Sequence, residues 1–582
     1  MDILFITPTH KPGLSQEING TMLLATKLLQ AGFTTDILRF YQVDGFDSDY
    51  PRFIDNITQK ILQMAPRFLS FYSLWPSFHI ILRIVQRIKQ IAPHIPVILG
   101  GPLVSLYPET VMNSCPWVDY LCAGEGENTI VPFMNALTGK QSIESVPGLY
   151  YRKDGVLVHN EHPIPLCNLN TLPNWDCSLF ASDPRLEDRI TDKKYFMPID
   201  VGRGCPFNCT FCCTSHFWSH TYRLKSAEKI VDELKYYRNN FNIRSFLFSH
   251  DAFTVKKNLV SEVCDRILEE KLDINWCCTT RADCVTEELL LKMKDAGLSY
   301  IQLGVETGSE RMQQQINKRL DLNVVKNVVH FLLKNKIDLL LFFMYGFPEE
   351  TEDDLRKTLD LIFYFYDIGV RHITMSFLNF SPATQITLDY YDQLVFDPNL
   401  AVSARCDFGY EEEMEIIQAN KDLFPFFYHL NTPLRNSYLF LTCLTAAYEA
   451  LPKEAKIIRS LYNGDDLAFY RDFVRNNPDC FDQYLNHAMD CVKKKPMVML
   501  YNTIRELDHP CITQIRSLLE FRKDCRKVKA SKEDIRLQKT YNFSYLDYHR
   551  GCPLDQYTSA QTELVMIKRD GKFSISLISI HE

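Results

Sequence analysis

Three cysteines in one short loop constrain this chain more than any other feature of its sequence. Cys205, Cys209 and Cys212 have C-x3-C-x2-C spacing in the stretch MPIDVGRGCPFNCTFCCTSHFW, behind an apolar run typical of a short strand. A tight loop after a strand can turn all three thiolates toward one point. Soft thiolates select iron-sulfur clusters or zinc over hard cations. Three protein ligands on a four-iron cluster leave one iron open to a ligand that is not protein.

A structural zinc site is the main alternative for this loop. Such sites use four ligands, often with a second CxxC or a pair of histidines. The sequence has no second CxxC, but Cys213, His216 and His220 lie close enough to keep this alternative open. Buried cysteines without a function are also common.

The segment GCPFNCTFC resembles the cluster-binding loop of radical S-adenosylmethionine (SAM) enzymes. The resemblance implies that Cys205, Cys209 and Cys212 bind a 4Fe-4S cluster and that the amino and carboxylate groups of SAM chelate the fourth iron. It also implies that Phe211, the aromatic residue before the last cysteine, lies near the adenine of SAM.

Length and composition set wider limits. A chain of 582 residues with 46% hydrophobic and 23% charged residues is typical of a globular protein with about three domains. The formal net charge of -8, without a basic block, argues against nucleic acid as the main partner. The 19 cysteines follow no regular framework and the chain starts with Asp2 rather than a basic stretch, so we expect no secretory signal and a reducing cytoplasm. The apolar runs are too short to span a membrane.

Residues 1–145 alternate short apolar strands with amphipathic helices. Strands are expected at 2–7, 34–40, 68–72, 96–99 and 117–122, and helices at 20–31, 53–64, 77–91 and 109–113. This alternation predicts a doubly wound, Rossmann-like α/β domain with a parallel sheet. Ligands of such sheets lie beyond the carboxyl ends of the strands. The loops to examine are therefore 7–13, 73–77, 100–102 and 123–127.

Two of these loops carry a second resemblance. VILGGPLVSLYPETV and VDYLCAGEGENTI resemble the cobalamin-binding domain that precedes the radical SAM domain in one large subclass of the family. The resemblance implies cobalamin contacts at Thr7, Pro8, Ser73, Leu74, Trp75, Gly100, Gly101, Pro102, Gly124, Glu125 and Glu127. The Asp-x-His-x-x-Gly segment whose histidine ligates cobalt in cobalamin mutases is absent. We expect Trp75 beneath the cobalt; packing in the domain core is the alternative for Trp75, and simple turn formation for the glycines.

After an expected linker at 146–195, with a hairpin turn at 153–155, the alternation resumes in residues 196–385. Strands are expected at 245–249, 275–280, 300–304, 337–345 and 373–377, and helices at 226–239, 257–269, 287–296, 324–335 and 352–368. With the strand before the cysteines, these elements predict six units of a partial (β/α)6 TIM-type barrel of the radical SAM type. Sites of such barrels lie at the carboxyl edge of the strands.

Polar residues follow these strands in the order expected for SAM-binding segments. The resemblance implies SAM contacts at Asp251, Arg281, Glu306, Ser309, Arg311, Gly346 and Pro348, besides Phe211. Each has a simpler explanation: Asp251 as a turn cap, Glu306 and Arg311 as an ion pair, and GFPEET as an acidic helix start. In FSHDAF, His250 holds a position where relatives with a cobalamin domain often carry an acid.

Residues 386–582 contain no motif that we can interpret. We expect a mostly helical domain that shapes the substrate pocket, with helices at 411–420, 436–450, 465–475 and 511–528 and a final hairpin that turns at 570–571. The scattered cysteines of this region lack cluster spacing, so no auxiliary cluster is expected.

Together these features predict a cobalamin-dependent radical SAM enzyme with a 4Fe-4S cluster, SAM and methylcobalamin as cofactors. The resemblance implies that reductive cleavage of SAM gives a 5'-deoxyadenosyl radical, which removes hydrogen from an unactivated carbon, and that a class B C-methyltransferase then transfers the methyl group of methylcobalamin. A small-molecule or peptide substrate and an electron donor such as flavodoxin or ferredoxin are the expected partners. Alternatives are a non-methylating radical step, a tRNA methylthiotransferase, and a zinc-binding or cofactor-sensing protein.

Overall fold

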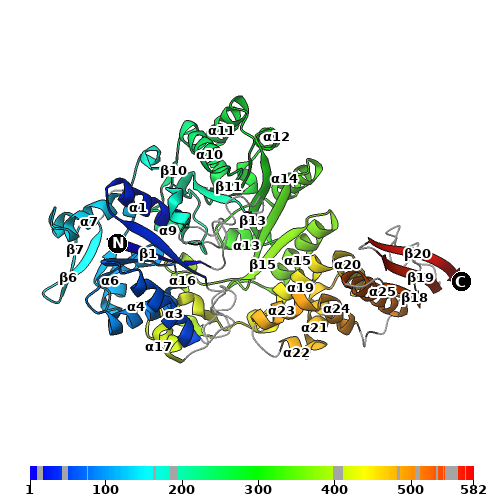
Figure 1. Cartoon of the computed structure of the whole chain (residues 1–582). Helices are drawn as coiled ribbons and strands as arrows, with labels where there is room; N and C mark the ends of the chain where they lie inside the picture. Colours follow the sequence, from blue (N-terminus) through cyan, green and yellow to red (C-terminus); the bar gives the residue numbers. More distant parts are fainter. Residues whose placement is uncertain are drawn as a thin grey trace. The chain divides into compact units, whose positions relative to one another are not determined.

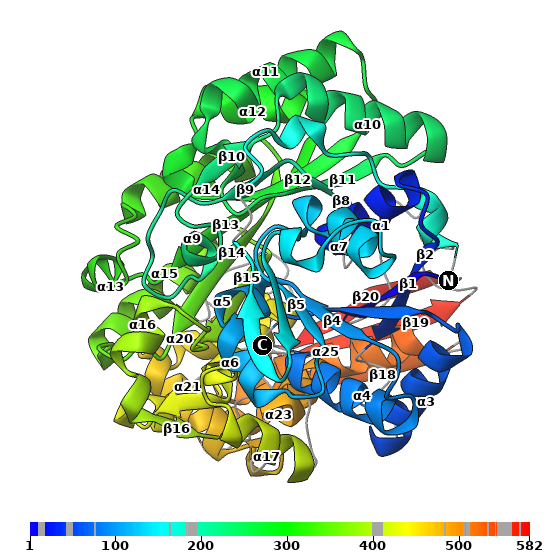
Figure 2. The same cartoon turned by 90° about the vertical axis from the view of Figure 1, so that its left-hand side faces the viewer.

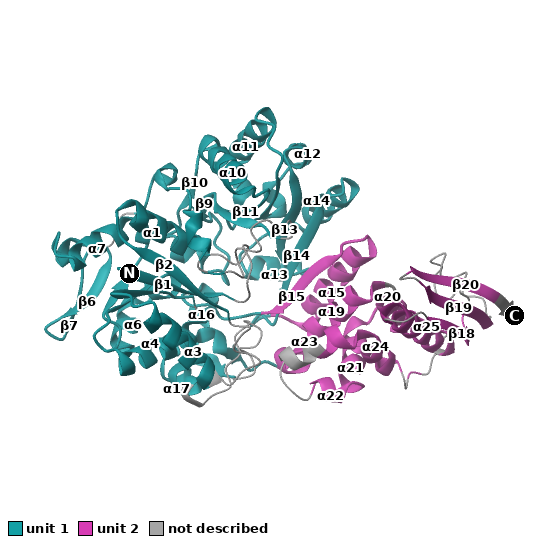
Figure 3. Cartoon of the chain, viewed as in Figure 1, with its two compact units in different colours: residues 1–349, 378–432 teal, residues 350–377, 433–582 magenta. Residues whose placement is uncertain are grey.

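The computed structural model describes residues 1–9, 18–41, 50–74, 77–161, 165–181, 183, 195–397, 411–481, 485–504, 507, 512–531, 535–541, 543, 561–569 and 572–581. The chain divides into two compact units (Figure 3). Unit 1 contains residues 1–349 and 378–432, and unit 2 contains residues 350–377 and 433–582. No helix in the described ranges is both long enough and apolar enough to cross a membrane.

Unit 1 begins with five parallel strands connected by helices, as the alternation of the sequence predicts (Figure 1). The strands are β1 (Ile3–Thr9), β2 (Thr35–Tyr41), β3 (Phe68–Tyr72), β4 (Val97–Gly100) and β5 (Tyr120–Cys122). The helices are α1 (Asn19–Gln30), α3 (Tyr50–Gln63), α4 (Phe78–Ile91), α5 (Pro102–Leu106), α6 (Pro108–Ser114) and α7 (Ile130–Leu137). All seven residues of β1 are buried, because helices cover both faces of the sheet.

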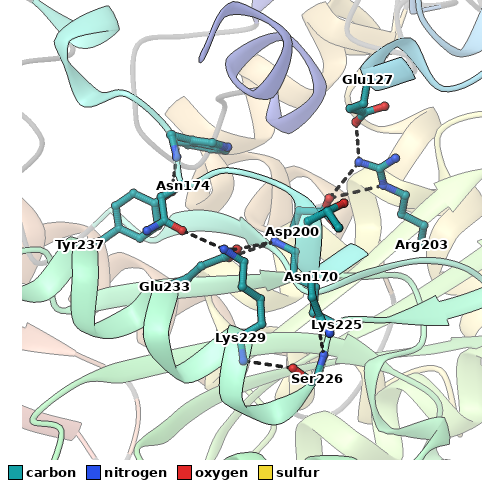
Figure 4. Close-up of polar contacts among 12 residues, drawn as sticks. Glu127, Asn170, Asn174, Asp200, Arg203, Lys225, Ser226, Lys229, Glu233 and Tyr237 are labelled. Atoms are coloured by element: carbon teal, nitrogen blue, oxygen red, sulfur yellow. Dashed lines mark hydrogen bonds and ion pairs between the residues drawn. The ribbon is translucent and has the colours of Figure 1, made fainter. Parts of the chain in front are cut away.

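Two antiparallel strands from the expected linker extend this sheet. The predicted hairpin is confirmed as β6 (Leu149–Lys153) and β7 (Val156–His159), and β6 pairs with β5 to give the order β2-β1-β3-β4-β5-β6-β7. Residues 174 and 175 of the segment contact α10 (Ala227–Phe241). There the Trp175 N–H donates to the Tyr237 hydroxyl over 2.6 Å, and Lys229 Nζ donates to Asn174 Oδ1 over 3.2 Å (Figure 4).

The second sheet of unit 1 contains the expected barrel strands. Five parallel strands lie in the order β14-β13-β12-β11-β8, namely β8 (Met197–Asp200), β11 (Ser245–Ser249), β12 (Asn275–Thr280), β13 (Leu298–Glu306) and β14 (Asp338–Tyr345). Between them come α11 (Lys257–Glu269), α12 (Glu287–Asp295), α13 (Glu310–Gln315) and α14 (Leu322–Lys334). Figures 1 and 2 show α10, α11 and α12 together on one side of this sheet. A short antiparallel pair, β9 (Gly202–Gly204) and β10 (Tyr222–Leu224), flanks the cysteine loop.

The described residues of the segment 378–432, namely 378–397 and 411–432, pack in part against α4 of unit 1. This segment contains α16 (Gln385–Asp389), β16 (Leu394–Phe396), α17 (Glu411–Ala419) and β17 (Tyr428–Leu430). Its aromatic residues pack on α4: the rings of Phe78 and Phe424 are 5.9 Å apart, and those of His79 and Phe427 are 5.5 Å apart. Sequence reasoning assigned most of this segment to a C-terminal domain, and the three expected domain boundaries stay a prediction.

Unit 2 is mostly helical, as predicted for the C-terminal region. It contains α15 (Glu352–Asp367) and β15 (His372–Phe377), the sixth expected strand, followed by α18 (Pro433–Tyr438), α19 (Leu441–Ala450), α20 (Pro452–Ser460), α21 (Asp466–Arg475), α22 (Pro478–Phe481), α23 (Leu485–Lys494), α24 (Pro496–Thr503) and α25 (Ile512–Ala530). The predicted hairpin is present as β19 (Gln561–Arg569) and β20 (Lys572–His581), although its turn lies outside the described residues. A third strand, β18 (Ile535–Tyr541), pairs with β19 and was not predicted.

Candidate functional site

The cysteine loop lies between β9 and α9 (Thr214–Phe217) and is fixed by backbone hydrogen bonds. The Thr210 N–H donates to the Ile316 carbonyl over 3.0 Å, and the Thr210 carbonyl accepts from the Ile386 N–H over 3.0 Å. The Asn317 side chain donates to the Asn208 carbonyl over 2.7 Å. Bonds from two separate segments therefore hold the loop in one conformation.

The three thiols of the loop are half-buried and lie within electrostatic range of one another. Burial raises the pKa of Cys205 to about 11 and also raises the pKa values of Cys209 and Cys212. Thiolates in this loop therefore need a metal to stabilise them. Among the described residues, no three His, Cys, Asp or Glu side chains converge closely enough to hold a single metal ion. Ligands of a cubane each bind a different iron, so they need not converge on one atom.

Arg281 places a positive charge beside the cysteine loop. Its guanidinium lies 3.9 Å from the ring centre of Phe207, pairs with Asp283 over 2.8 Å and donates to the Lys318 carbonyl over 2.9 Å. Its Nη1 atom is buried and has no hydrogen-bond partner in the structure. A buried N–H group without a partner costs free energy, so this atom fits an anionic ligand better than an empty site.

Glu306 forms a buried ion pair, but not with Arg311 as the simpler explanation proposed. Its Oε1 lies 2.7 Å from Lys318 Nζ, and both side chains are buried. The backbone of Glu306 has a φ of +73°, at a shift of register between β13 and β14. A Cβ on Gly304 would lie 2.6 Å from Glu306 Oε1 and 2.8 Å from Lys318 Nζ, so a side chain there would force the ends of these two side chains to shift.

The other expected SAM contacts surround the same strand ends. The Ser309 hydroxyl accepts from the Met312 N–H over 3.3 Å and so caps α13, and Arg311 Nη2 donates to the Glu349 carbonyl over 2.5 Å. That bond holds the turn containing Gly346 and Pro348. Gly346 has a φ of +84°, and the rings of Phe211 and Phe347 meet edge to face at 6.3 Å. Phe211 thus lies against the fifth-strand segment.

The expected cobalamin loops are bound to each other at the carboxyl edge of the first sheet. The backbone N–H and the hydroxyl of Ser73 both donate to the Gly100 carbonyl over 2.7 Å. A Cβ on Gly101, whose φ is +112°, would lie 2.7 Å from the Ser73 carbonyl oxygen. Leu74 accepts from the Ser77 N–H over 3.1 Å. Trp75 lies outside the described residues.

Thr7 and Pro8 occupy a different position from the one expected. The sequence placed them in a loop after the first strand, but β1 continues to Thr9, and they pair in register with Arg39 and Phe40 of β2. Both are buried within the sheet. Parallel pairing with β2 extends the strand by two residues, which the apolar pattern alone did not indicate.

A cavity of about 440 Å³ lies between the two sheets of unit 1. On one side it is lined by the cobalamin-loop residues Gly100, Gly101, Pro102, Gly124, Glu125 and Glu127. On the other side are residues from the ends of the first two barrel strands, namely Asp200, Gly202, Arg203, Gly204, His250 and Asp251, together with Phe217 and Trp218. Burial raises the pKa of Asp251, although a side-chain hydrogen bond with Thr214 opposes this shift.

Arg203 connects the two walls of this cavity. Its guanidinium lies 2.5 Å from Glu127, 3.2 Å from Glu125 and 3.2 Å from Asp200, and all four side chains are less than a tenth exposed (Figure 4 shows Glu127, Asp200 and Arg203). Arg223 also pairs with Glu125. Burial lowers the pKa of Arg203, but Glu127 and Asp200 outweigh it, so the net pKa is raised and the guanidinium stays charged.

Sequence reasoning missed this network. It assigned Glu125 and Glu127 to cobalamin, whereas their carboxylates pair with arginines from the barrel side of the cavity. The signal available was the GRG segment directly before Cys205, which places an arginine between two glycines beside the cysteine loop. Lys318, the partner of Glu306, was also missed. It lies 12 residues after Glu306 and outside any motif.

Two family models match separate parts of the chain. Residues 12–133 match the B12 binding domain, and residues 199–362 match the radical SAM superfamily. An uncharacterised methyltransferase of Pyrococcus horikoshii is 29% identical over 54% of this chain and 68% of its own length. An anaerobic magnesium-protoporphyrin IX monomethyl ester cyclase of Rubrivivax gelatinosus is 27% identical over 62% of this chain and 65% of its own length. The match spans about two thirds of each relative.

Solved structures share the fold. The cobalamin-dependent SAM radical enzyme OxsB, with aqua-cobalamin bound, aligns with a TM-score of 0.57 over 92% of this chain and 82% of its own, at 15% identity. The radical SAM methyltransferase TsrM from Kitasatospora setae, with cobalamin and a 4Fe-4S cluster bound, aligns with a TM-score of 0.53 over 68% and 75%, at 14% identity. The chain therefore combines a B12-binding domain with a radical SAM domain, and the cofactors of these two domains are cobalamin, a 4Fe-4S cluster and SAM.

Proposed function

We propose that the chain is a class B methyltransferase that methylates an unactivated carbon of a small-molecule or peptide substrate. One observation carries this proposal: the loops of the B12-binding domain and the first strand ends of the barrel line a single cavity. Methyl transfer to a substrate radical requires that the methyl donor and the radical source reach the same carbon. A shared cavity meets this requirement.

Cys205, Cys209 and Cys212 are the proposed cluster ligands. Their loop is rigid, and Arg281 and Lys318 oppose the effect of burial on Cys209 by favouring its thiolate. Cys213 is left out of this set because it follows Cys212 directly and lies outside the C-x3-C-x2-C spacing. When bound, the three cofactors supply electron transfer, the 5'-deoxyadenosyl radical and the methyl group.

The chain's own residues then bind and orient the other two cofactors. Arg281 offers its unpartnered Nη1 to an anionic group of SAM, while Glu306, Ser309 and Arg311 form the fourth-strand segment around it. Phe211, Gly346 and Pro348 are the proposed adenine side, and Asp251, which lines the cavity, is a further proposed SAM contact. Gly100, Gly101, Pro102 and Gly124 allow the close backbone approach that a large planar cofactor needs. An electron donor such as flavodoxin or ferredoxin is the proposed partner.

A non-methylating radical step is the second candidate, because the chain is also similar to a magnesium-protoporphyrin IX monomethyl ester cyclase. Anaerobically reconstituted protein, incubated with cobalamin, reductant and SAM labelled in its methyl group, separates the two. A methyltransferase transfers the label from SAM to cobalamin. A non-methylating enzyme forms 5'-deoxyadenosine while the label stays on SAM and methionine. The Cys209→Ala variant is the control for both reactions, and label transfer that survives in this variant contradicts the proposed site.

A further inference from the structure

The barrel side of the cavity in unit 1 contains an apolar pair of side chains. Residues 200, 202–204, 217, 218 and 249–251 line this side, and most of them are charged, polar or glycine. Among these described residues, Phe217 and Trp218 have the apolar side chains. They lie at the end of α9, and their rings meet edge to face with centres 4.6 Å apart. Neither residue is among the predicted cobalamin or SAM contacts.

The aromatic pair is attached to the cysteine loop. The Phe217 N–H donates to the Cys213 carbonyl over 2.9 Å, so α9 continues directly from the loop. A Cβ on Gly204 would lie 3.3 Å from the Cβ of Trp218. Trp218 therefore packs closely on the residue directly before Cys205. These contacts hold the pair in one position relative to the three cysteines.

The indole of Trp218 is also held by the charges that connect the two sides of the cavity. The guanidinium groups of Arg203 and Arg223 lie 5.5 and 5.8 Å from its ring centre, close enough for attraction to the π electrons of the indole. The two arginines are paired across β9 and β10, and both form ion pairs with Glu125. Glu125 follows Gly124, which lines the opposite side of the cavity. The indole is therefore fixed against both loops.

The opposite side of the cavity indicates what the aromatic pair covers. It contains Gly100, Gly101 and Gly124, and backbone without side chains allows a broad, flat ligand to approach closely. The second face of such a ligand is directed toward the barrel. The corrin ring of cobalamin is a broad, flat and largely apolar surface, and ligand sites cover such surfaces with apolar and aromatic side chains. Phe217 and Trp218 are the described barrel-side residues with this character.

We propose that Trp218, supported by Phe217, contacts bound cobalamin from the barrel side of the cavity. The inference rests on the proposed function, since that function places cobalamin in this cavity, but it does not depend on which reaction follows. Because Trp218 is attached to the cysteine loop, the contact fixes the position of cobalamin relative to the cluster. The cobalamin site is then completed by a residue of the radical SAM domain.

Fluorine NMR of the full, cluster-loaded chain labelled with 5-fluorotryptophan tests this contact. The five tryptophans are assigned with single Trp→Phe variants. Cob(II)alamin has an unpaired electron that broadens nearby resonances, an effect that falls steeply with distance, and cob(III)alamin is the diamagnetic reference; the cluster stays oxidised in both samples. We expect cob(II)alamin to broaden the Trp218 resonance far more than that of Trp276. Trp276 is the control, because it lies at the amino end of β12, stacked on Phe248.

An optical titration with cobalamin measures the contribution of the contact to binding. Trp218→Leu removes the aromatic ring and should bind cobalamin at least about tenfold more weakly. Trp218→Phe keeps a ring and should stay within about threefold of the native chain. Trp276→Phe, which is already needed for the assignment, is the matched control and should bind as tightly as the native chain.

The possible failures can be told apart. If absorption shows bound cobalamin while the Trp218 resonance stays as sharp as that of Trp276, the inference is wrong. Unchanged affinity in Trp218→Leu also overturns it. A native chain that retains no cobalamin refutes the proposed function and the inference together. A broadened Trp218 resonance in a chain that transfers no methyl group from SAM refutes the proposed function alone.

Discussion

Replacing Arg203 by methionine tests whether the buried ion pairs join the two halves of the cavity. The change removes one positive charge and leaves three carboxylates that are 5 to 8% exposed. Arg223 still pairs with Glu125, but Glu127 and Asp200 lose the cation that the structure shows beside them. Removing one partner of a buried pair costs about 3–5 kcal/mol, because the remaining charge has no compensation. We expect the free energy of unfolding of Arg203→Met to fall by this amount.

The assay is a urea titration of the full chain followed by tryptophan fluorescence, since Trp218 lies 5.5 Å from the Arg203 guanidinium. The matched control is Arg67→Met. Arg67 pairs with Asp2 over 3.4 Å at the surface, where its side chain is 60% exposed. A pair of this kind contributes less than about 1 kcal/mol. The reasoning is refuted if the two variants lose the same stability.

A second measurement separates positioning of the loop from general stability. Glu125 and Glu127 belong to the loop that includes Gly124, so releasing them should loosen the cobalamin site. We expect Arg203→Met to bind cobalamin at least about tenfold more weakly by optical titration, which corresponds to about 1.4 kcal/mol. Arg203→Lys keeps the charge but not the planar guanidinium, so its cobalamin affinity should lie between those of the native chain and Arg203→Met. Unchanged cobalamin affinity in a destabilised Arg203→Met would show that the network supports the fold alone.

Two further predictions concern the barrel side of the cavity. Gly304→Ala should separate Glu306 from Lys318, lower the unfolding free energy by about 1–3 kcal/mol and weaken SAM binding. Gly20→Ala is the control, because nothing lies within 4 Å of a Cβ at that position, and it should change neither the unfolding free energy nor SAM binding. Equal effects of the two changes would contradict the steric argument. Burial lowers the pKa of His250 to about 4 from 6.5, so its contribution to stability is complete above pH 6.5 and is lost as the pH falls toward 4, by up to about 3 kcal/mol. His250→Asn keeps an acceptor for the Ala252 N–H and should reduce this loss in urea titrations between pH 7 and 5; an unchanged pH dependence would rule out His250 as its source.

The sequence predicted the order of elements well because hydrophobic periodicity is a local property. The expected helix at 257–269 and strand at 275–280 match α11 and β12 at both ends. Pairing between strands that are distant in the sequence was harder to predict. The hairpin β6–β7 was predicted, but its addition to the edge of the first sheet depends on the β5–β6 pairing, which has no local signal. The strand β18 alternates partly buried and exposed residues up to the buried Tyr541. It was missed because its strand conformation depends on pairing with β19, which is distant in the sequence.

The candidate site shows the same division between local and distant information. Local spacing was enough to select the three cysteines, and glycine patterns were enough to select the cavity-lining loops at Gly100 and Gly124. The partners of buried charges were not predictable in this way. Glu306 pairs with Lys318 and Glu127 with Arg203, and each pair depends on the packing of separate segments. Motifs therefore predicted which residues are candidates for binding cofactors, but not which charges hold those residues in place.

The account depends on three cysteines that bind three irons and leave the fourth to SAM. Electron paramagnetic resonance of the anaerobically reconstituted, reduced chain, recorded with and without SAM, tests this directly. We expect a 4Fe-4S signal that changes shape when SAM is added, disappears in Cys209→Ala and persists in the control Cys213→Ala. A signal that does not respond to SAM, or one that requires Cys213 as much as Cys209, would contradict the central claim.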